Sequence, residues 1–419
     1  MNASSRLRRP GIPMPMLLVL GAVFVLSIGR VLANTPDVTS SDTFGAALRL
    51  ALPIGLAGFG GLVSERAGVV NIGLEGMMIL GTWGAGFAGW HWGPWAALIG
   101  GALGGAVGGL LHALATVTFG VDHVISGVAI STFLAPGVTR FLATLLFRSE
   151  SGGAAGSSPP VRGELGRLTA PFLAGGRIGS WRSPDVLGSV ERHHWFFASD
   201  LAGLIRGPFA KIGVATIVLL AVFPLVAFVL WRTRLGLRLR SVGEHPSGAE
   251  SLGLPVARLR YIAVTLSGTL AGLGGAFLVL ESTKYREGQT GGRGFIGLAA
   301  LIFGNWQPRA VAAGASLFGY TDALQLRSSK SVLALLVVAA IAGAALVVLG
   351  VRQRRNGQVL VGLVIAALFS FLFATSDTIP NQFVYVTPYV TTLFLLAVAT
   401  QRLRPPQALG VPWRRGEVT

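Results

Sequence analysis

The chain has 419 residues, of which 52% are hydrophobic and only 12% are charged, and its mean hydropathy is +0.65. This composition is too apolar for a soluble fold of this size and predicts an all-α polytopic membrane protein. The net charge of +17 would suggest nucleic-acid binding in a soluble protein. Here the arginines cluster between apolar runs, as the positive-inside bias produces, so we expect no nucleic-acid partner.

The apolar run after the basic start RLRRP is long and lacks a convincing cleavage site, so we interpret it as a retained span. Other runs long enough, or nearly long enough, to cross about 30 Å of hydrocarbon follow it. In chain order the runs cover residues 14–33, 43–62, 72–92, 94–119, 121–147, 209–231, 259–281, 292–305, 308–326, 331–351, 358–375 and 385–402.

Arginine-rich segments predict the orientation of these spans. They are the N-terminus, a loop at residues 232–258, the RQRRNG turn and the C-terminal tail, and the positive-inside bias places such segments in the cytoplasm. Twelve crossings satisfy all four constraints, so we expect both termini to be cytoplasmic. The chain has no cysteine, which excludes disulfides and thiolate metal sites.

The longest polar interval, residues 148–208, is then expected on the outside. Its start, SESGGAAGSSPP, is typical of a flexible loop, and its later HHWFF is suited to the headgroup boundary. His193 and His194 have no supporting carboxylate or cysteine pattern, so we interpret them as surface residues and expect no metal.

Glycine is frequent, with 59 residues, and it forms a repeating pattern in the fourth run. In GGALGGAVGG, the residues Gly100, Gly104 and Gly108 lie four apart and have a second glycine beside each of them. We expect a bare helix face for close helix packing, because a phosphate-binding loop needs a soluble strand-turn-helix context. The run GTLAGLGG at residues 268–275 is interpreted in the same way.

Charged residues interrupt the apolar pattern in SERAGVVNIGLEGMM. We expect Ser64, Glu65 and Arg66 to lie solvated at the cytoplasmic boundary. Asn71 and Glu75 are four residues apart, so we expect them to share one face of the third span and to point to the bundle interior or an aqueous path. Two roles remain open for Glu75: a packing contact with an arginine or backbone amide of a neighbouring span, or a part in transport.

The loop at residues 232–258 contains GEHPSGAESLGLP, which predicts a short helix. Pro246 suits the first helical position, and Gly253 suits a left-handed stop before the next proline. The small residues Gly248 and Ala249 would leave room for a docking partner, and acidic residues would offer it salt bridges. The alternative is a connector that only covers the helix ends.

Five ordered blocks resemble the permease subunit of bacterial ABC importers for simple sugars and, most closely, nucleosides. They are SERAGVVNIGLEGMM, VDHVISGVAIS, SVGEHPSGAESLGL, RYIAVTLSGTLAGLGGAFL and GRGFIGLAALIFGNWQP. The resemblance covers residues 43–147 and 209–326, within the superfamily of branched-chain amino acid, ribose and nucleoside permeases. It departs from the family at His245, where asparagine is usual, and at Ala67, where serine is common.

This resemblance implies a type II-like architecture with about ten core helices, and the hairpin at residues 328–378 would raise the number to about twelve. It also implies one transmembrane permease domain over residues 1–419 in the bacterial cell membrane. The expected partners are an ATP-binding subunit, a second homologous permease, an extracytoplasmic solute-binding lipoprotein and membrane lipids. No cofactor is expected on this chain, because it has no GxxxxGK[ST] sequence, and the partner would hydrolyse the ATP.

The resemblance also suggests site residues. Coupling to the ATPase is expected at Gly243, Glu244, His245, Pro246, Ala249, Glu250 and Gly253. The substrate path is expected to include Phe59, Asn71, Glu75, Asn305 and Trp306.

Two other classes of function are less consistent with the sequence. A secondary transporter or channel that works without an ATPase would favour an inverted repeat, yet Glu75 has no evident counterpart in the second half. An intramembrane enzyme would need a catalytic cluster, and Asp122 with His123 comes closest. We expect Asp122 to be the N-cap of the fifth span instead, and we predict no catalytic residues.

Overall fold

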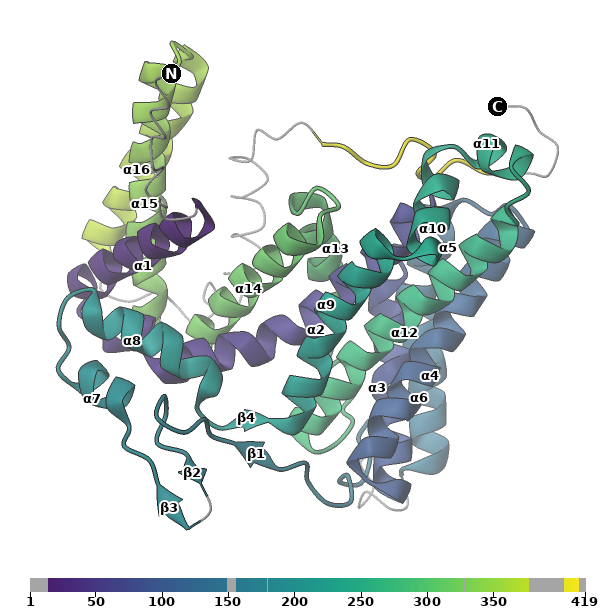
Figure 1. Cartoon of the computed structure of the whole chain (residues 1–419), viewed down its shortest axis with the longest axis horizontal. Coiled ribbons are helices and arrows are strands. Elements are labelled where there is room, and N and C mark those ends of the chain that lie inside the picture. Colours follow the sequence, from purple (N-terminus) through teal and green to yellow (C-terminus); the bar gives the residue numbers. More distant parts are fainter. Residues whose placement is uncertain (1–13, 149–155, 179, 328, 377–402, 414–419) are drawn as a thin grey trace, which may run out of the picture. The chain divides into compact units, whose positions relative to one another are not determined.

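The computed structural model describes residues 14–148, 156–178, 180–327, 329–376 and 403–413. Its internal contacts divide the chain into two units, which we describe separately (Figure 1). The first unit comprises residues 1–46, 169–211 and 323–387, and the second comprises residues 47–168, 212–322 and 388–419. The assignment of one transmembrane domain over residues 1–419 stays a prediction.

The second unit contains most of the predicted spans. Its first helix begins a few residues inside the first unit, and its last helix ends a few residues inside it. Its elements are α2 (Ser41–Arg66), α3 (Leu74–Trp92), α4 (Pro94–Ala113), η2 (Leu114–Thr118), α5 (His123–Ala129), η3 (Ile130–Leu134), α6 (Ala135–Leu146), β1 (Arg167–Leu168), β4 (Ile212–Gly213), α9 (Val214–Arg232), α10 (Arg234–Glu244), α11 (Pro246–Ser251), α12 (Val256–Ser282), α13 (Arg293–Phe303) and α14 (Pro308–Gln325). Strands β1 and β4 pair antiparallel, with Arg167 opposite Gly213.

Asp122 accepts hydrogen bonds from the backbone N–H groups of Val124 (2.9 Å) and Ile125 (3.0 Å), which confirms it as the N-cap of α5.

Apolar helices confirm a polytopic membrane protein. Within the described residues, seven helical segments are long and apolar enough to cross a bilayer: Ser41–Arg66, Pro94–Thr118, His123–Leu146, Val214–Arg232, Val256–Ser282, Ser331–Arg352 and Asn356–Thr375. The runs predicted at residues 14–33, 72–92, 292–305 and 308–326 are also helical, as α1, α3, α13 and α14. The run at residues 385–402 lies outside the described residues.

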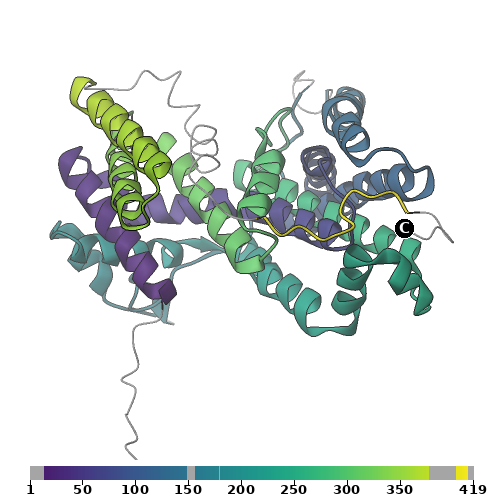
Figure 2. The same cartoon turned by 90° about the horizontal axis from the view of Figure 1, so that it is seen from above.

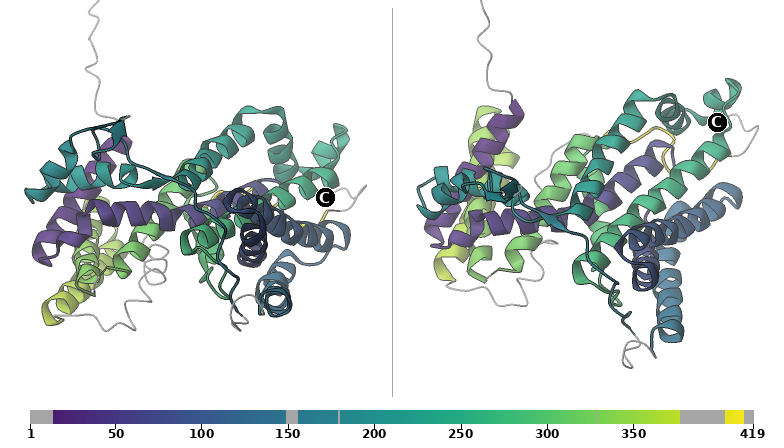
Figure 3. Two further views of the ribbon diagram at one scale, coloured as in Figure 1. Left: turned by 90° about the horizontal axis from the view of Figure 1, so that it is seen from below. Right: turned by 60° about the horizontal axis from the view of Figure 1, so that its bottom comes forward.

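Three helices, α3, α4 and α12, lie side by side through glycine contacts (Figures 1 and 3). A Cβ atom added to Gly104 would lie 3.3 Å from the Cα of Gly81 on α3, and one added to Gly105 would lie 2.6 Å from the Cα of Gly272 on α12. The two glycine rows of α4 therefore contact two different neighbours. The predicted packing face is confirmed, and the run at residues 268–275 supplies its counterpart.

The first unit contains the described part of the chain between residues 169 and 211 together with the N-terminal helix and the added hairpin. Its elements are α1 (Met14–Leu32), η1 (Pro36–Thr39), β2 (Arg177–Ile178), β3 (Trp181–Arg182), α7 (Val186–Arg192), α8 (Ala198–Arg206), η4 (Gly207–Phe209), α15 (Ser329–Arg352) and α16 (Asn356–Thr375). Arg30 of α1 forms an ion pair with Asp200 of α8 at 2.9 Å, and Asp200 also accepts a hydrogen bond from Thr39. Helix α8, which lies in the predicted outer loop, is thus packed on α1 and η1.

Helices α15 and α16 form the predicted hairpin and run along each other (Figure 2). A Cβ atom added to Gly343 would lie 3.0 Å from the backbone oxygen of Gly362, so small residues again allow a close approach. Helix α16 exposes apolar side chains at Leu360, Leu363, Val364, Leu368 and Phe371. These exposed apolar residues suit a lipid-facing surface.

Arg206 of α8 joins three parts of the first unit, the start of α2 among them, and predicts a pH dependence. Its guanidinium bonds Asp185 at 2.7 Å, Glu191 at 3.2 Å and the Ser41 hydroxyl at 2.6 Å. The hydrogen bonds from Arg206 lower the pKa of Asp185 below its ordinary value. A carboxyl group whose pKa is lower in the folded state stabilises the fold above its unfolded pKa, and this contribution is lost as the pH falls through its folded pKa.

We therefore expect Asp185→Asn to lower the thermal unfolding midpoint by about 2 °C at pH 7. The difference from the unchanged protein should begin to shrink as the pH falls to about 4, the ordinary pKa of an aspartate, and should go on shrinking until the carboxyl group of the folded protein is protonated. The measurement is thermal unfolding of both proteins at matched pH values, so that other titrating groups cancel. A difference that is constant from pH 7 to pH 3 would contradict this role.

Candidate functional site

The α10–α11 loop has the local structure that its sequence predicts. Helix α10 ends at Glu244, His245 is non-helical, and Pro246 occupies the first position of α11. Gly253 follows with a φ of +81°, a left-handed conformation that glycine adopts without steric cost. The predicted short helix and its glycine stop are both confirmed.

Burial divides the loop into an inner and an outer side. Gly243, Pro246 and Ala249 are buried, whereas Glu244 and His245 are exposed. The expectation that Ala249 leaves room for a partner is wrong, because its side chain is 3% exposed and packs in the hydrophobic core of its own unit. Its small size instead lets α11 lie close to the chain beneath it.

Leu252 is a prominent residue of this loop that the sequence analysis missed. It follows α11 directly and is 84% exposed, the highest value among the exposed large hydrophobic side chains in the described residues. The sequence did contain a signal for it, since Leu252 is an apolar residue between a short amphipathic helix and its glycine stop. An isolated exposed leucine is ordinary, but here it adjoins Gly248, Ser251 and Gly253, which are also exposed.

Glu244 links this loop to the end of α2. Its carboxylate lies 3.7 Å from the Nη1 atom of Arg66 and accepts a hydrogen bond of 3.1 Å from the backbone N–H of Gln407. Arg66 in turn donates to the backbone oxygen of Trp306 at 2.8 Å, and its guanidinium lies over the ring of Trp231. A displacement of Glu244 would therefore shift the end of α2 and the turn after α13.

The residues before Arg66 are not solvated, and that expectation is wrong. Ser64 is fully buried and Glu65 is 2% exposed. Helix α2 continues to Arg66, and Trp306 covers Glu65 and donates its indole N–H to that carboxylate at 2.6 Å. Ser64 donates its hydroxyl to the backbone oxygen of Val69 at 2.7 Å. The hydrogen bonds of Ser64 and Glu65 thus stabilise the end of α2 and the turn that follows it.

Asn71 and Glu75 do not share a helix face, because α3 begins only at Leu74. Asn71 lies in the preceding turn and donates to the hydroxyl of Ser267 on α12 at 2.8 Å. Glu75 accepts hydrogen bonds from the backbone N–H groups of Gly292 (3.0 Å) and Gly294 (2.7 Å) at the start of α13. Glu75 thus makes the contact with backbone amides of a neighbouring helix that its packing role requires. A lining role for either residue stays a prediction.

The other predicted path residues lie in two places. Phe59 is buried and stacks on Phe223, with ring centroids 4.7 Å apart. Asn305 and Trp306 form the turn after α13 and have φ angles of +47° and +54°. Asn305 lies with Glu244 in the lining of one cavity, which does not include Phe59.

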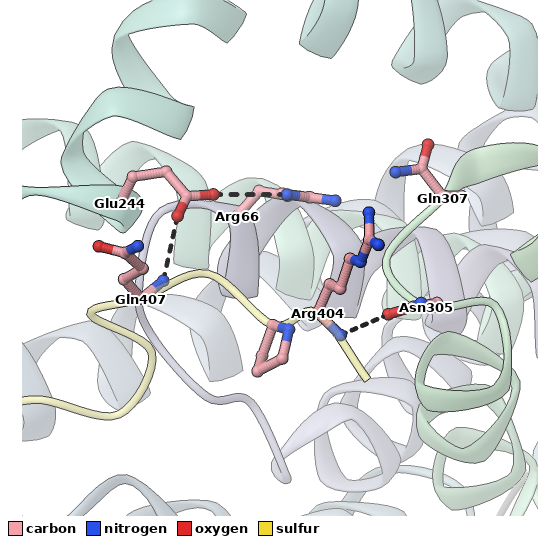
Figure 4. Close-up of a pocket in the computed structure, with 7 residues that line it drawn as sticks. Arg66, Glu244, Asn305, Gln307, Arg404 and Gln407 are labelled. Atoms are coloured by element: carbon pink, nitrogen blue, oxygen red, sulfur yellow. Dashed lines mark hydrogen bonds and ion pairs between the residues drawn. The ribbon is translucent and has the colours of Figure 1, made fainter. Parts of the chain in front are cut away.

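A polar cavity of about 450 Å³ connects Asn305 with the coupling loop (Figure 4). It is lined by Arg66, Glu244, Asn305, Gln307, Arg404, Pro405 and Gln407. Figure 4 shows that its charged and amide side chains come from the end of α2, the α10–α11 loop, the turn after α13 and the C-terminal segment. The site is thus a place where four parts of the second unit meet.

The fold and this loop define a polytopic α-helical membrane protein with a short exposed helix between two of its spans. The family described as branched-chain amino acid transport system / permease component matches residues 43–337. The chain belongs to this family. It is a permease subunit of an ABC importer, and such permeases are transport components rather than enzymes.

Relatives support the same assignment over most of the chain. The guanosine ABC transporter permease protein NupQ of Bacillus subtilis is 31% identical over 89% of this chain and 96% of its own length. The nucleoside ABC transporter permease protein NupC of Lactococcus lactis is 30% identical over 86% of this chain and 92% of its own. The putative glucose ABC transporter permease protein TsgC13 of Haloferax volcanii is 35% identical over 73% and 83%, respectively.

Proposed function

We propose that this permease subunit translocates nucleosides, with related simple sugars as the second candidate class. The proposal is supported by the names of two relatives, a guanosine permease and a nucleoside permease, which align with 89% and 86% of this chain. The sugar alternative is supported by the relative named as a putative glucose permease. An extracytoplasmic solute-binding lipoprotein would deliver the solute, and a second homologous permease would complete the path.

The observation that carries the coupling mechanism is the two-sided α10–α11 loop. Its exposed side presents Glu244 and Leu252 to an ATP-binding subunit, and its buried side packs through Gly243 against the end of α2. A Cβ atom on Gly243 would lie 2.8 Å from the backbone carbon of Arg66, so no gap separates the two. Pressure on α11 is therefore transmitted directly to α2, as alternating access by rigid-body movement requires.

We infer a cell-membrane protein with cytoplasmic termini and a type II-like arrangement of about ten core helices plus the α15–α16 hairpin. ATP would be bound and hydrolysed by the partner subunit, with no cofactor on this chain. In this topology the α10–α11 loop and its exposed Leu252 would lie on the side of the membrane where ATP is available.

The substrate class is tested by reconstitution. The permease should be co-reconstituted in liposomes with its second permease, ATP-binding subunit and binding protein, and uptake of radiolabelled guanosine and glucose should be compared. We expect guanosine to be accumulated when ATP is supplied, and an excess of unlabelled nucleoside to abolish that uptake. Accumulation by this chain alone, without an ATPase, would support the alternative of a secondary transporter.

The docking role of the loop predicts a large effect of Glu244→Lys. The substitution reverses the charge offered to the partner and repels Arg66, so we expect ATP-driven uptake to fall at least about tenfold. The protein should remain folded, because the Glu244 side chain is 46% exposed. The measurements are uptake and co-purification with the ATP-binding subunit.

Glu244→Gln is the matched control for this prediction. It removes the charge but keeps an oxygen that accepts the Gln407 N–H, so its effect on uptake should be clearly smaller. Undiminished ATP-driven uptake by Glu244→Lys would reject the docking role.

A further inference from the structure

The C-terminal segment at residues 403–413 lies across the coupling site, and we call it the C-terminal strap. In Figure 1 it is the yellow segment beside α10 and α11. It has no regular secondary structure and contains turns at residues 407–410. Its two consecutive prolines, Pro405 and Pro406, restrict the backbone before those turns.

The strap is held by its backbone rather than by side-chain packing alone. The N–H of Arg404 donates to the Asn305 side chain at 2.7 Å, and the N–H of Gln407 donates to the Glu244 carboxylate at 3.1 Å. The next N–H, from Ala408, donates to the backbone oxygen of Gly243 at 3.0 Å. Consecutive strap residues thus bind both the side chain and the backbone at the end of α10.

The far end of the strap reaches two further elements. The N–H of Gly410 donates to the backbone oxygen of Gly68 in the α2–α3 turn at 3.0 Å. The buried Arg260 of α12 donates to the backbone oxygen of Val411 at 3.3 Å. Trp413 packs against the same hydrophobic core that contains Ala249. The strap therefore connects the α10–α11 loop with the turns after α2 and α13 and with α12.

We propose that the C-terminal strap is a positioning element of the coupling site, which binds Glu244 and Gly243 to the ends of α2 and α13. This inference rests on the proposed coupling function of the α10–α11 loop. When the ATP-binding subunit moves α11, the strap makes the turns at Gly68 and Asn305 move with it. Without these bonds only the packing of Gly243 against Arg66 would transmit the movement to α2, and ATP hydrolysis would be partly uncoupled from translocation.

The variant Gln407→Pro tests this role specifically. The N–H of Leu409 donates to the oxygen of Pro406 at 3.1 Å, so Gln407 occupies the second position of a four-residue turn, where proline is favoured. Proline therefore suits the turn but removes the N–H that Glu244 accepts. Gln407→Ala, which keeps that N–H, is the reference variant.

The two variants should be compared in the reconstituted importer. Loss of a hydrogen bond to a charged group predicts that Gln407→Pro takes up about tenfold less solute per ATP hydrolysed than Gln407→Ala. Hydrogen exchange of residues 241–254 should be faster in Gln407→Pro, whereas the thermal unfolding midpoints of the two variants should agree. A merely structural role would change the unfolding midpoint and leave the uptake per ATP unaltered.

Each other result decides against the role of the strap or against the function on which it rests. Equal uptake per ATP in the two variants would show that the bond from the strap to Glu244 has no part in coupling. Failure of only Gln407→Pro to assemble would show that the strap serves folding instead. If Gln407→Ala itself shows no ATP-dependent uptake while the importer with the unchanged chain is also inactive, the proposed function fails rather than the role of the strap.

Discussion

Gly272→Ala is expected to prevent stable assembly of the helix bundle, although it adds only one methyl group. A Cβ atom at this position of α12 would lie 2.8 Å from the Cα and 2.9 Å from the backbone N of Gly105 on α4. Real Cβ atoms do not approach a backbone so closely, and backbone cannot turn aside as a flexible side chain does. Helices α4 and α12 would have to separate along their whole contact.

The cost should reach or exceed the upper end of the range of about 1–3 kcal/mol for overpacking. The matched control is Gly137→Ala in α6, where the added Cβ would meet nothing within 4 Å. This control should be neutral or slightly stabilising, because alanine favours helix by about 1 kcal/mol over glycine. The measurement is the yield of monodisperse protein and its thermal unfolding midpoint in detergent. A similar outcome for the two variants would contradict the proposed tightness of the glycine contact.

Sequence patterns predicted these helix contacts because glycine spacing is a local property. Residues four apart must share one helix face, so Gly100, Gly104 and Gly108 indicated a bare surface without knowledge of the partner. The same applies to α11, whose first residue and stop follow from the conformations of Pro246 and Gly253. In both cases the residues themselves restrict the backbone.

Contacts between distant residues were not predictable in this way. Glu65 was expected in water, and its burial depends on Trp306, which lies 241 residues away in the chain. The C-terminal strap was assigned only as a basic cytoplasmic tail, since backbone N–H groups leave no pattern in a sequence. Its bond to Glu244 spans 163 residues. Such pairings are determined by tertiary structure, and a single sequence carries no signal for them.

The segment at residues 169–211 shows a third limit. Its glycine-rich and proline-rich surroundings are typical of a loop, yet it contains α7 and α8, and two carboxyl groups bind these helices to other parts of the first unit. Asp200 pairs with Arg30 of α1, and Glu191 accepts a hydrogen bond of 2.7 Å from the backbone N–H of Ser41. Composition indicates whether a segment is able to form a large core. It does not indicate whether the segment packs on a neighbouring helix.

Glu75→Leu is expected to destabilise the permease strongly. The leucine side chain has a similar size but leaves the part-buried N–H of Gly292 and the buried N–H of Gly294 without this acceptor. It also removes a negative charge from the N-terminus of α13, where the helix dipole favours an anion. Losing two hydrogen bonds to a carboxylate predicts a cost of about 3 kcal/mol or more.

The same variant separates the two roles that Glu75 was assigned from the sequence. If Glu75 fixes packing, Glu75→Leu lowers the thermal unfolding midpoint and the assembled yield, and uptake falls in proportion to the protein that remains assembled. Glu75→Gln, which keeps one acceptor oxygen, should then be intermediate in both stability and uptake. If Glu75 lines the path, uptake per assembled importer falls in Glu75→Leu while the unfolding midpoint is unchanged. The packing role is favoured because both carboxylate oxygens already accept bonds from α13 and only 5% of the residue is exposed.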